Sequence, residues 1–100
     1  MGVDVASSQV MSRLGMKGAL VLEVVRGGAA EQAGIRPTTR DRRGSIMLGD
    51  VITGINDDPI NSRGDLVLAL EKYKPGEKVM MKLLRDYEPF EVELTLDQAR

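Results

Sequence analysis

The chain has 100 residues, with 14 lysine or arginine and 15 aspartate or glutamate side chains, so its net charge is −1. This length predicts one domain with a single core, and the balanced charge gives no general attraction to nucleic acid or to an anionic membrane. The sequence has no apolar run long enough to span a bilayer, no stretch of the signal-peptide type and no cysteine, which excludes disulfides and thiolate metal sites.

Histidine is also absent from the sequence. Catalysis by a Ser-His-Asp triad or a Cys-His pair needs an imidazole as general base, so the serines of this chain lack their usual partner. A Ser-Lys arrangement stays open, although no lysine stands in a context that indicates burial. We therefore expect a chain that binds a ligand and has no catalytic residue, cofactor or metal site of its own.

The first predicted element is a short strand. Val3 and Val5 alternate with Asp4, which is the period of a half-buried strand, and Gly2 adds backbone freedom just before it. We interpret residues 1–6 as an open sheet edge that accepts a partner peptide as an additional strand. The free amides at the head of this strand would then hold the terminal carboxylate of the peptide.

The next elements follow from capping residues and apolar runs. Ser7 or Ser8 is a suitable N-cap for a helix of about seven residues, which Gly15 ends. Residues 19–25 are a nearly continuous apolar run, which is typical of a buried central strand. One or two helical turns are predicted over residues 29–33.

Residues 35–45 are charged and show no periodic pattern, and four of them are arginines. Such a run could contact phosphate or an acidic partner surface, but it is more typical of a solvated surface loop. No aromatic residues are interleaved for base stacking, which argues against nucleic acid. A strand is predicted over residues 51–56. The two aspartates that follow indicate a turn, because no further oxygen ligands stand at the spacing of a calcium loop.

The clearest helix begins after a very short strand at residues 59–60. Residues 62–65 have the Ser-x-x-acid form of a capping box. Strands at 79–85 and 90–96 are joined by a turn and form a hairpin. The core-facing side of the helix is predicted to consist of Leu66, Ala69, Leu70 and Tyr73.

Several stretches stand in the order and spacing of a PDZ domain. They are residues 18–22, 28–35, 48–56, 65–70, 75–76 and 83–86. Over essentially its whole length the chain resembles the PDZ domains of HtrA/Deg-type (DegP-like) serine proteases, and the run Gly-Asp-Val-Ile-x-x-Ile-Asn is the most specific part of the match. The insertion between Gly34 and Gly49 is similar to that of Deg proteases from photosynthetic organisms.

This resemblance implies a mainly β fold with short helices (α+β), a single PDZ domain over residues 1–100. The implied architecture is a partly open barrel of five or six strands, capped by two or three helices. Its topology would be the permuted HtrA type, in which the carboxylate-binding strand comes first. A groove for an extended peptide with a free C-terminus would lie between this strand and the capped helix.

The resemblance also assigns site residues. Met1, Gly2 and Val3 match the loop whose backbone amides bind a terminal carboxylate, and such charge-assisted bonds are strong. The pocket for the last side chain of the peptide favours an aliphatic residue, alanine or phenylalanine. The implied groove residues are Val3, Asp4, Val5, Ala6, Arg63, Val67 and Leu70. The pocket for the last side chain would be lined by Met1, Val3, Val5 and Leu70, and Val67 would lie alongside it.

Alternatives remain for the helix residues. Arg63 stands where some eukaryotic PDZ domains carry a histidine that selects serine or threonine. With arginine there, the implied partner is an acidic residue or a carbonyl at the third position from the end of the peptide. Arg63 could equally be a solvated first-turn residue, and Val67 and Leu70 could serve plain core packing.

The implied function is that of a peptide-binding module of an HtrA/Deg-like serine protease. It would capture hydrophobic C-termini or extended segments of misfolded proteins by β-strand addition, and regulate proteolysis or oligomer assembly through the protease domain of the parent chain. The alternatives are a stand-alone adaptor and the PDZ domain of a membrane-embedded processing peptidase. The resemblance implies the periplasm, the cell envelope or the thylakoid lumen as the compartment, with neither nucleic-acid binding nor membrane insertion.

Overall fold

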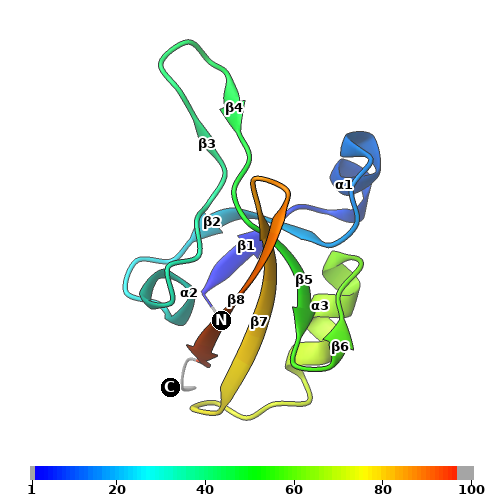
Figure 1. Cartoon of the computed structure of the whole chain (residues 1–100), viewed down its shortest axis with the longest axis vertical. Helices are drawn as coiled ribbons and strands as arrows, with labels where there is room; N and C mark the ends of the chain where they lie inside the picture. Colours follow the sequence, from blue (N-terminus) through cyan, green and yellow to red (C-terminus); the bar gives the residue numbers. More distant parts are fainter. Residues whose placement is uncertain (1, 97–100) are drawn as a thin grey trace.

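The computed structural model describes residues 2–96, which form eight strands and three helices (Figure 1). No helix in this part of the chain is long and apolar enough to cross a membrane. The strands are β1 (Val3–Val5), β2 (Ala19–Val24), β3 (Thr39–Arg40), β4 (Ile46–Met47), β5 (Val51–Ile55), β6 (Asp58–Pro59), β7 (Lys78–Arg85) and β8 (Glu88–Thr95). The helices are α1 (Ser8–Leu14), α2 (Ala29–Gln32) and α3 (Arg63–Leu70).

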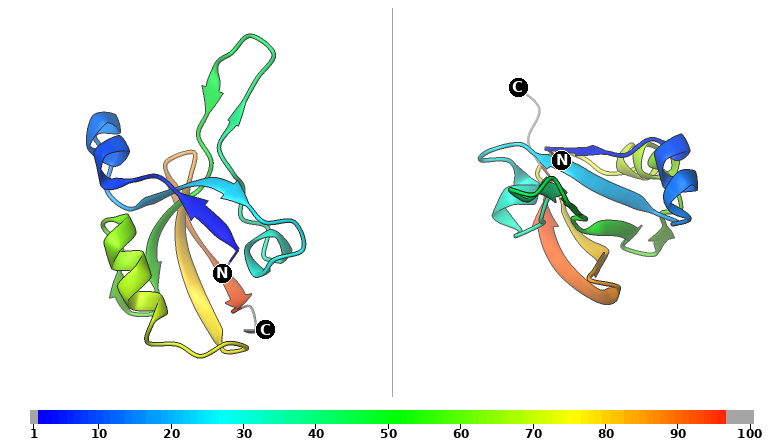
Figure 2. Two further views of the ribbon diagram at one scale, coloured as in Figure 1. Left: turned by 180° about the vertical axis from the view of Figure 1, so that it is seen from behind. Right: turned by 90° about the horizontal axis from the view of Figure 1, so that it is seen from above.

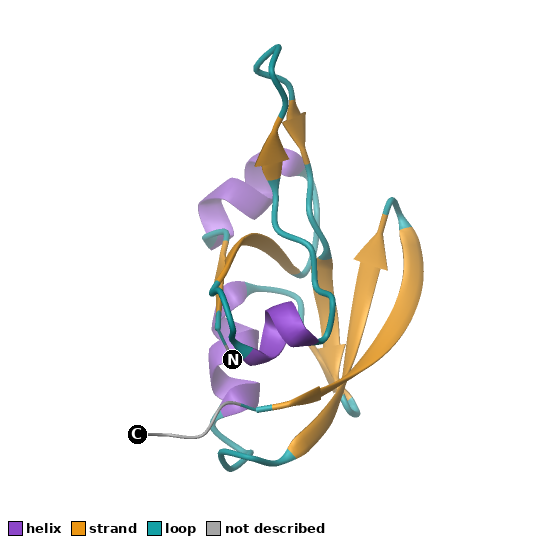
Figure 3. Ribbon diagram, turned by 90° about the vertical axis from the view of Figure 1, so that its left-hand side faces the viewer, coloured by secondary structure: helices purple, strands orange, loops and turns teal. Residues whose placement is uncertain are grey.

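Six strands form one open antiparallel sheet. Its order is β1-β2-β5-β7-β8, and the short β6 pairs with β5 beside this path. The long β7–β8 hairpin curves away from the layer formed by β1 and β2 (Figure 3). β1 and β8 are therefore the two end strands of this order, and each has an open edge. This open antiparallel sheet with three short helices confirms the predicted mainly β class with short helices.

The alternation of side chains in the strands divides the interior into two apolar clusters. The main cluster contains Val21, Ile52 and Met81, which are fully buried together with residues of α2 and α3. The neighbouring strand residues Leu20 and Val51 face the opposite side and form a second, smaller cluster with Ala6 and Met11 of the N-terminal segment. Burying such side chains contributes about 1.5–3 kcal/mol each, so these clusters position the edge strand and α3.

The first helix confirms the local prediction at both ends. The Ser7 Oγ accepts the Val10 N–H at 3.4 Å, so Ser7 is the N-cap, and Gly15 ends α1 with a φ of 68°. Only Met11 of this helix is buried, whereas Val10 and Leu14 are largely exposed. The helix therefore contacts the core through one side chain.

The capping box of α3 is confirmed at its serine and differs at its acid. The Ser62 Oγ accepts the Asp65 N–H at 3.2 Å, but the Asp65 carboxylate accepts the N–H of Asn61 rather than that of Ser62. The predicted core-facing side is also confirmed. Leu66 and Ala69 are buried in the main cluster, and Leu70 and Tyr73 pack against it partly buried.

The prediction of an irregular loop over residues 35–45 is wrong in its second half. β3 and β4 pair as a two-stranded antiparallel sheet, with Arg40 opposite Ile46. The Asp41 carboxylate closes the turn by accepting the N–H groups of Arg43 and Ser45, both at 2.9 Å. Figure 1 shows this hairpin projecting from the body of the molecule, and we call residues 39–47 the arm.

Tertiary contacts hold the base of the arm. The Thr38 hydroxyl donates to the Val21 carbonyl at 2.7 Å and accepts the Gly49 N–H at 3.0 Å. A Cβ at Gly49 would collide with the backbone of Pro37, so the close approach of the two chain segments requires glycine there. Strands of two residues are too short to show an alternating apolar pattern in the sequence, and this is why the arm was not predicted.

Candidate functional site

The free edge of β1 is defined by its hydrogen bonds to β2. The Gly2 carbonyl accepts the Val25 N–H at 2.7 Å, and the Ala6 N–H donates to the Leu20 carbonyl at 2.9 Å. In an antiparallel strand the peptide groups of alternate residues face the same side. The N–H and C=O groups of Val3 and Val5 must therefore face away from β2, toward the open edge of the sheet.

A turn in the left-handed region precedes this edge. Gly2 has a φ of 77°, a conformation that other residues adopt only with strain. The loop between β2 and α2 passes behind it, because a Cβ added at Gly28 would lie 3.6 Å from the Cα of Gly2. The backbone at the head of β1 is thus held in a bent conformation against a second segment. The predicted role of Met1 lies outside the described residues.

The side chains of β1 and α3 meet in the main apolar cluster. Val5 is buried there with Leu66 and Ala69, while Val3 and Leu70 pack against the same cluster and remain partly accessible. Both views in Figure 2 place β1 and α3 on the same side of the molecule. Val3, Val5 and Leu70 therefore adjoin the same apolar cluster, and the pocket that they were predicted to line remains a prediction.

The other predicted groove residues lie differently. The Val67 side chain is 50% exposed and does not belong to either cluster, and Asp4 is exposed between the two valines of β1. Arg63 is exposed in the first turn of α3, and within residues 2–96 its guanidinium has no hydrogen bond or ion pair. Ala6 is buried in the second cluster. Its predicted contribution to the groove remains a prediction.

Asp58 anchors the C-terminal end of α3, a role that sequence reasoning missed. Its carboxylate accepts from the Lys72 ammonium at 3.1 Å and from the Tyr73 hydroxyl at 3.2 Å. The predicted turn holds for Asp57, but Asp58 begins β6, so the short strand predicted at residues 59–60 lies at Asp58–Pro59 instead. The Tyr73 partner of Asp58 lies 15 residues away in the sequence. Since β6 pairs with β5, this contact connects the end of the helix to the sheet.

A buried ion pair joins the start of β5 to the end of β7. Asp50 is only 1% exposed, and both of its carboxylate oxygens accept from the Arg85 guanidinium, at 2.9 and 2.8 Å. Arg85 also donates to the Gly34 carbonyl and stacks on the Phe90 ring. These hydrogen bonds to Asp50 raise the pKa of Arg85 above its ordinary value, so the guanidinium stays charged. Sequence reasoning missed this pair too.

The described residues contain no group of three or more acidic, histidine or cysteine side chains placed to hold a metal ion. The geometry consists of an open strand edge, a bent backbone before it and an adjoining apolar rim. A model of the PDZ domain matches residues 1–96. The chain belongs to the PDZ domain family. It is therefore a non-catalytic module.

The relatives of this PDZ domain are proteases. It is 36% identical over 97 residues to the chloroplastic protease Do-like 8 of Arabidopsis thaliana, covering 96% of the chain and 22% of that relative. It is 38% identical over 83 residues to the periplasmic pH-dependent serine endoprotease DegQ of Escherichia coli, covering 83% of the chain and 16% of that relative. The chain thus spans about a fifth of the length of these proteins.

A solved structure shows the same fold. The HtrA-type protease AlgW, whose structure was determined with a decapeptide, superimposes with a TM-score of 0.66 at 23% sequence identity. The match covers 99% of this chain and 28% of the AlgW chain. This likeness shows that the PDZ domain has the fold of the corresponding part of an HtrA-type protease.

Proposed function

We propose that this PDZ domain binds an extended peptide as an additional antiparallel strand along β1. The observation that supports this most directly is the outward direction of the Val3 and Val5 peptide groups at an open sheet edge. An extended peptide satisfies such groups with main-chain hydrogen bonds of its own. The terminal carboxylate of the peptide is held by the backbone amides of Met1, Gly2 and Val3, where charge-assisted bonds contribute most.

The last side chain of the peptide is apolar in this proposal. It packs against Val3 and Leu70, which are partly accessible on the rim of the main cluster above Val5, with Val67 and Met1 alongside. Burial of one aliphatic side chain contributes about 1.5–3 kcal/mol. Arg63, exposed and unpaired among the described residues, pairs with an acidic side chain or a carbonyl two residues before the end of the peptide.

We further propose that the module belongs to an HtrA/Deg-like serine protease. There it captures hydrophobic C-termini or extended segments of misfolded proteins and regulates proteolysis or assembly together with the protease domain. The identities of 36% and 38% to a chloroplastic and a periplasmic protease support this assignment. Catalysis would then reside in the part of the parent protein that this chain does not cover.

The test is an NMR titration of backbone amides with a short peptide that ends in a free valine, compared with its C-terminally amidated twin. We expect shifts at Gly2 to Ala6 and along α3 with the free acid, and at least tenfold weaker binding of the amide. Equal binding of both peptides would contradict the carboxylate site while leaving strand addition in place. Shifts confined to other surfaces would contradict the whole proposal.

Two glycines provide a matched pair of variants for the same titration. Gly2 and Gly15 both have positive φ, 77° and 68°, so replacement by alanine costs each about 1–2 kcal/mol. Only Gly2 adjoins the proposed carboxylate site. We expect Gly2→Ala to weaken binding of the free-acid peptide at least tenfold, and Gly15→Ala to leave it within twofold. Equal weakening would mean that general destabilisation, rather than the site, controls binding.

A further inference from the structure

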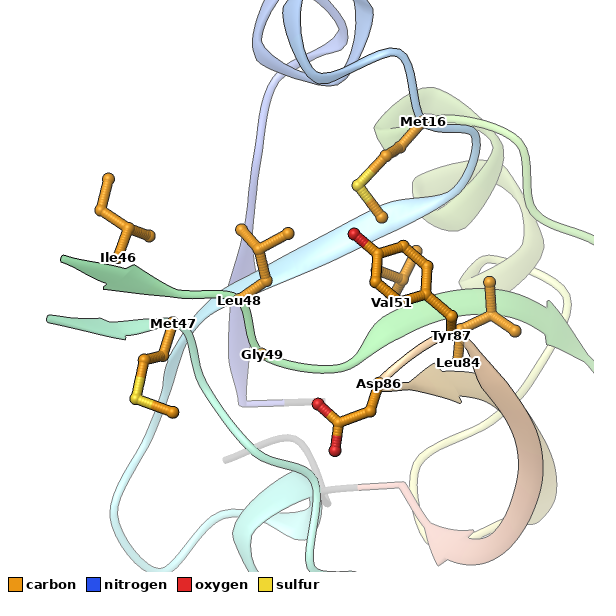
Figure 4. Close-up of a pocket in the computed structure, with 9 residues that line it drawn as sticks. All are labelled: Met16, Ile46, Met47, Leu48, Gly49, Val51, Leu84, Asp86 and Tyr87. Carbon is orange, nitrogen blue, oxygen red and sulfur yellow. The ribbon is translucent and has the colours of Figure 1, made fainter.

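A second concave surface lies at the base of the arm. It is a hollow of about 330 Å³ lined mainly by Met16, Leu48, Val51, Leu84, Asp86 and Tyr87. Figure 4 shows that Met16 comes from the loop before β2, Leu48 from the segment between the arm and β5, Val51 from β5, and the other three from the β7–β8 hairpin. We call it the arm pocket. It shares no residue with the predicted groove between β1 and α3.

The interior of the arm pocket is apolar and accessible. Val51 belongs to the second apolar cluster, and Met16 and Leu84 pack against that cluster, so the floor of the pocket is the core itself. Two large side chains flank this floor without being covered by the chain. Leu48 is 40% exposed, and Tyr87, in the hairpin turn, is 81% exposed. A floor and rim of this kind suit one bulky apolar side chain from outside the domain.

The arm beside this pocket carries a concentration of positive charge. Residues 39–47 contain three arginines and one acid, whereas the whole chain has a net charge of −1. Arg40 lies directly opposite Ile46, which lines the pocket, and Arg42 and Arg43 lie in the turn of the arm. The side chains of these three arginines have no ion pair within residues 2–96. The one acid, Asp41, uses its carboxylate to close the turn.

We propose that the arm pocket binds an acidic segment of a partner protein that presents a bulky apolar side chain. The apolar side chain fills the hollow between Leu48 and Tyr87, and flanking carboxylates pair with the arginines of the arm. Asp86 on the rim is a negative charge that this partner must avoid, so the acidic residues are expected on the arm side of the pocket. Charge complementarity therefore sets the orientation of the segment as well as its affinity.

The structure favours a protein segment over a lipid surface. A hairpin that inserts into a membrane presents its apolar side chains at the tip, but the tip of this arm consists of Asp41, Arg42, Arg43 and Gly44. The apolar side chains lie instead at the base, in a hollow. This arrangement fits a side chain that enters from beside the arm.

The test uses a fluorescent octapeptide of aspartate and glutamate with one central phenylalanine. Both of its ends are blocked, by acetylation and amidation, so it cannot use a carboxylate site at β1. We expect saturable binding by fluorescence anisotropy, with NMR shifts at Met16, Ile46 to Gly49 and Tyr87. Replacing the phenylalanine by alanine should weaken binding at least tenfold, since a filled apolar pocket contributes more than charge alone.

Two variants and a control distinguish the pocket from general charge attraction. Tyr87→Asn keeps a residue that tolerates the positive φ of 67° at this turn and removes one wall of the pocket. Arg42→Glu/Arg43→Glu reverses the charge of the arm tip. Each should weaken binding at least tenfold. The control, Arg26→Glu/Lys74→Glu, makes the same charge change at exposed positions elsewhere and should leave binding within threefold.

Three results would overturn the proposal. Equal weakening by the control would mean that the peptide is held by net charge only. Shifts confined to Val3–Val5 and α3 would mean that it adds to the sheet edge instead. Binding of the domain to vesicles of phosphatidylcholine and phosphatidylserine, without binding of the peptide, would assign the arm to a lipid surface.

Discussion

The two edges of the sheet differ in the residues whose peptide groups face outward. On β1 these residues are Val3 and Val5, whose side chains point into the main cluster. On β8 the sequence Glu88-Pro89 begins a strand that pairs continuously with β7, and Pro89 has no N–H to donate. In an antiparallel strand the peptide groups of alternate residues face the same side, so those of Pro89, Glu91 and Glu93 all face away from β7. All three of these residues are exposed.

This difference shows how one edge is left available for a partner and the other is protected. Proline removes a donor from the β8 edge, and the carboxylates of Glu91 and Glu93 repel a second strand, particularly another copy of the same edge. The β1 edge has no such residues, apart from Asp4, whose peptide group faces β2. It is also short, which limits pairing to a few residues of an extended ligand. The side chains of an edge strand thus decide whether the edge can accept another strand, although the hydrogen bonds to that strand are formed by the backbone.

The largest expected effect concerns the ion pair that holds the β7–β8 hairpin to the rest of the sheet. Arg85→Met retains an apolar contact with Phe90 but leaves the buried Asp50 carboxylate without its guanidinium. We expect the free energy of unfolding, measured in urea, to fall by about 3–5 kcal/mol. Lys72→Met breaks the exposed pair with Asp58 and should cost less than about 1 kcal/mol. Similar losses in both variants would contradict a special role for the buried pair.

The second prediction compares the effect of a proline in β1 with that of a proline in β8 on peptide binding. Val3→Pro removes an outward-facing N–H from β1, and we expect binding of a free-acid peptide to weaken at least tenfold, because a bond to a charged group contributes about 1.5–3 kcal/mol. Glu91→Pro removes an outward-facing N–H from β8 and should leave peptide binding unchanged. Thermal unfolding of both variants checks that they are folded. The comparison fails if both prolines weaken binding to the same extent.

A smaller effect is expected at the helix that borders the β1 edge. Leu70→Ala removes a partly accessible apolar side chain that packs against the same cluster as Val3, and it should weaken binding of a peptide ending in valine by about 1–1.5 kcal/mol, roughly tenfold. Leu68→Ala makes the same change on the same helix at a side chain that is 63% exposed. Its dissociation constant, measured by calorimetry, should stay within twofold of the original. Equal changes would place the ligand elsewhere on α3.

The smallest effect tests the protection of the β8 edge. Glu91→Thr/Glu93→Thr removes two carboxylates from exposed strand positions and should change the free energy of unfolding by no more than about 0.5 kcal/mol. We expect self-association to increase, measured by sedimentation velocity, because the edge becomes a better template for another strand. Glu23→Thr/Glu71→Thr makes the same charge change away from this edge and should remain monomeric under the same conditions.

Local sequence features predicted most of the secondary structure. Ser7 and Ser62 cap their helices, Gly15 ends the first helix, and the alternation of β8 places Phe90, Val92 and Leu94 on the core side. The resemblance to PDZ domains located the first strand and the capped helix, and Val3, Val5 and Leu70 of these elements adjoin the same apolar cluster. These features depend on neighbours along the chain or on a run of specific residues.

Other features of the site could not be read from the sequence. The arm depends on pairing between Arg40 and Ile46, and the position of α3 depends on the contact between Asp58 and Tyr73. In the sequence, Asp50 is an acidic residue just before a predicted strand, and nothing near it indicates burial. Only the fold shows that Asp50 is buried and paired with Arg85.

The sequence by itself determined the class of the fold, the helix caps and the residues of β1, because capping and alternation act over a few neighbouring residues. Only the tertiary structure decided that β1 stays at an open edge, that Asp50 is buried with a partner 35 residues away, and that apolar side chains meet the base of a basic arm. The reason is that such contacts depend on the path of the whole chain, since segments far apart in the sequence must be brought together before their side chains can interact.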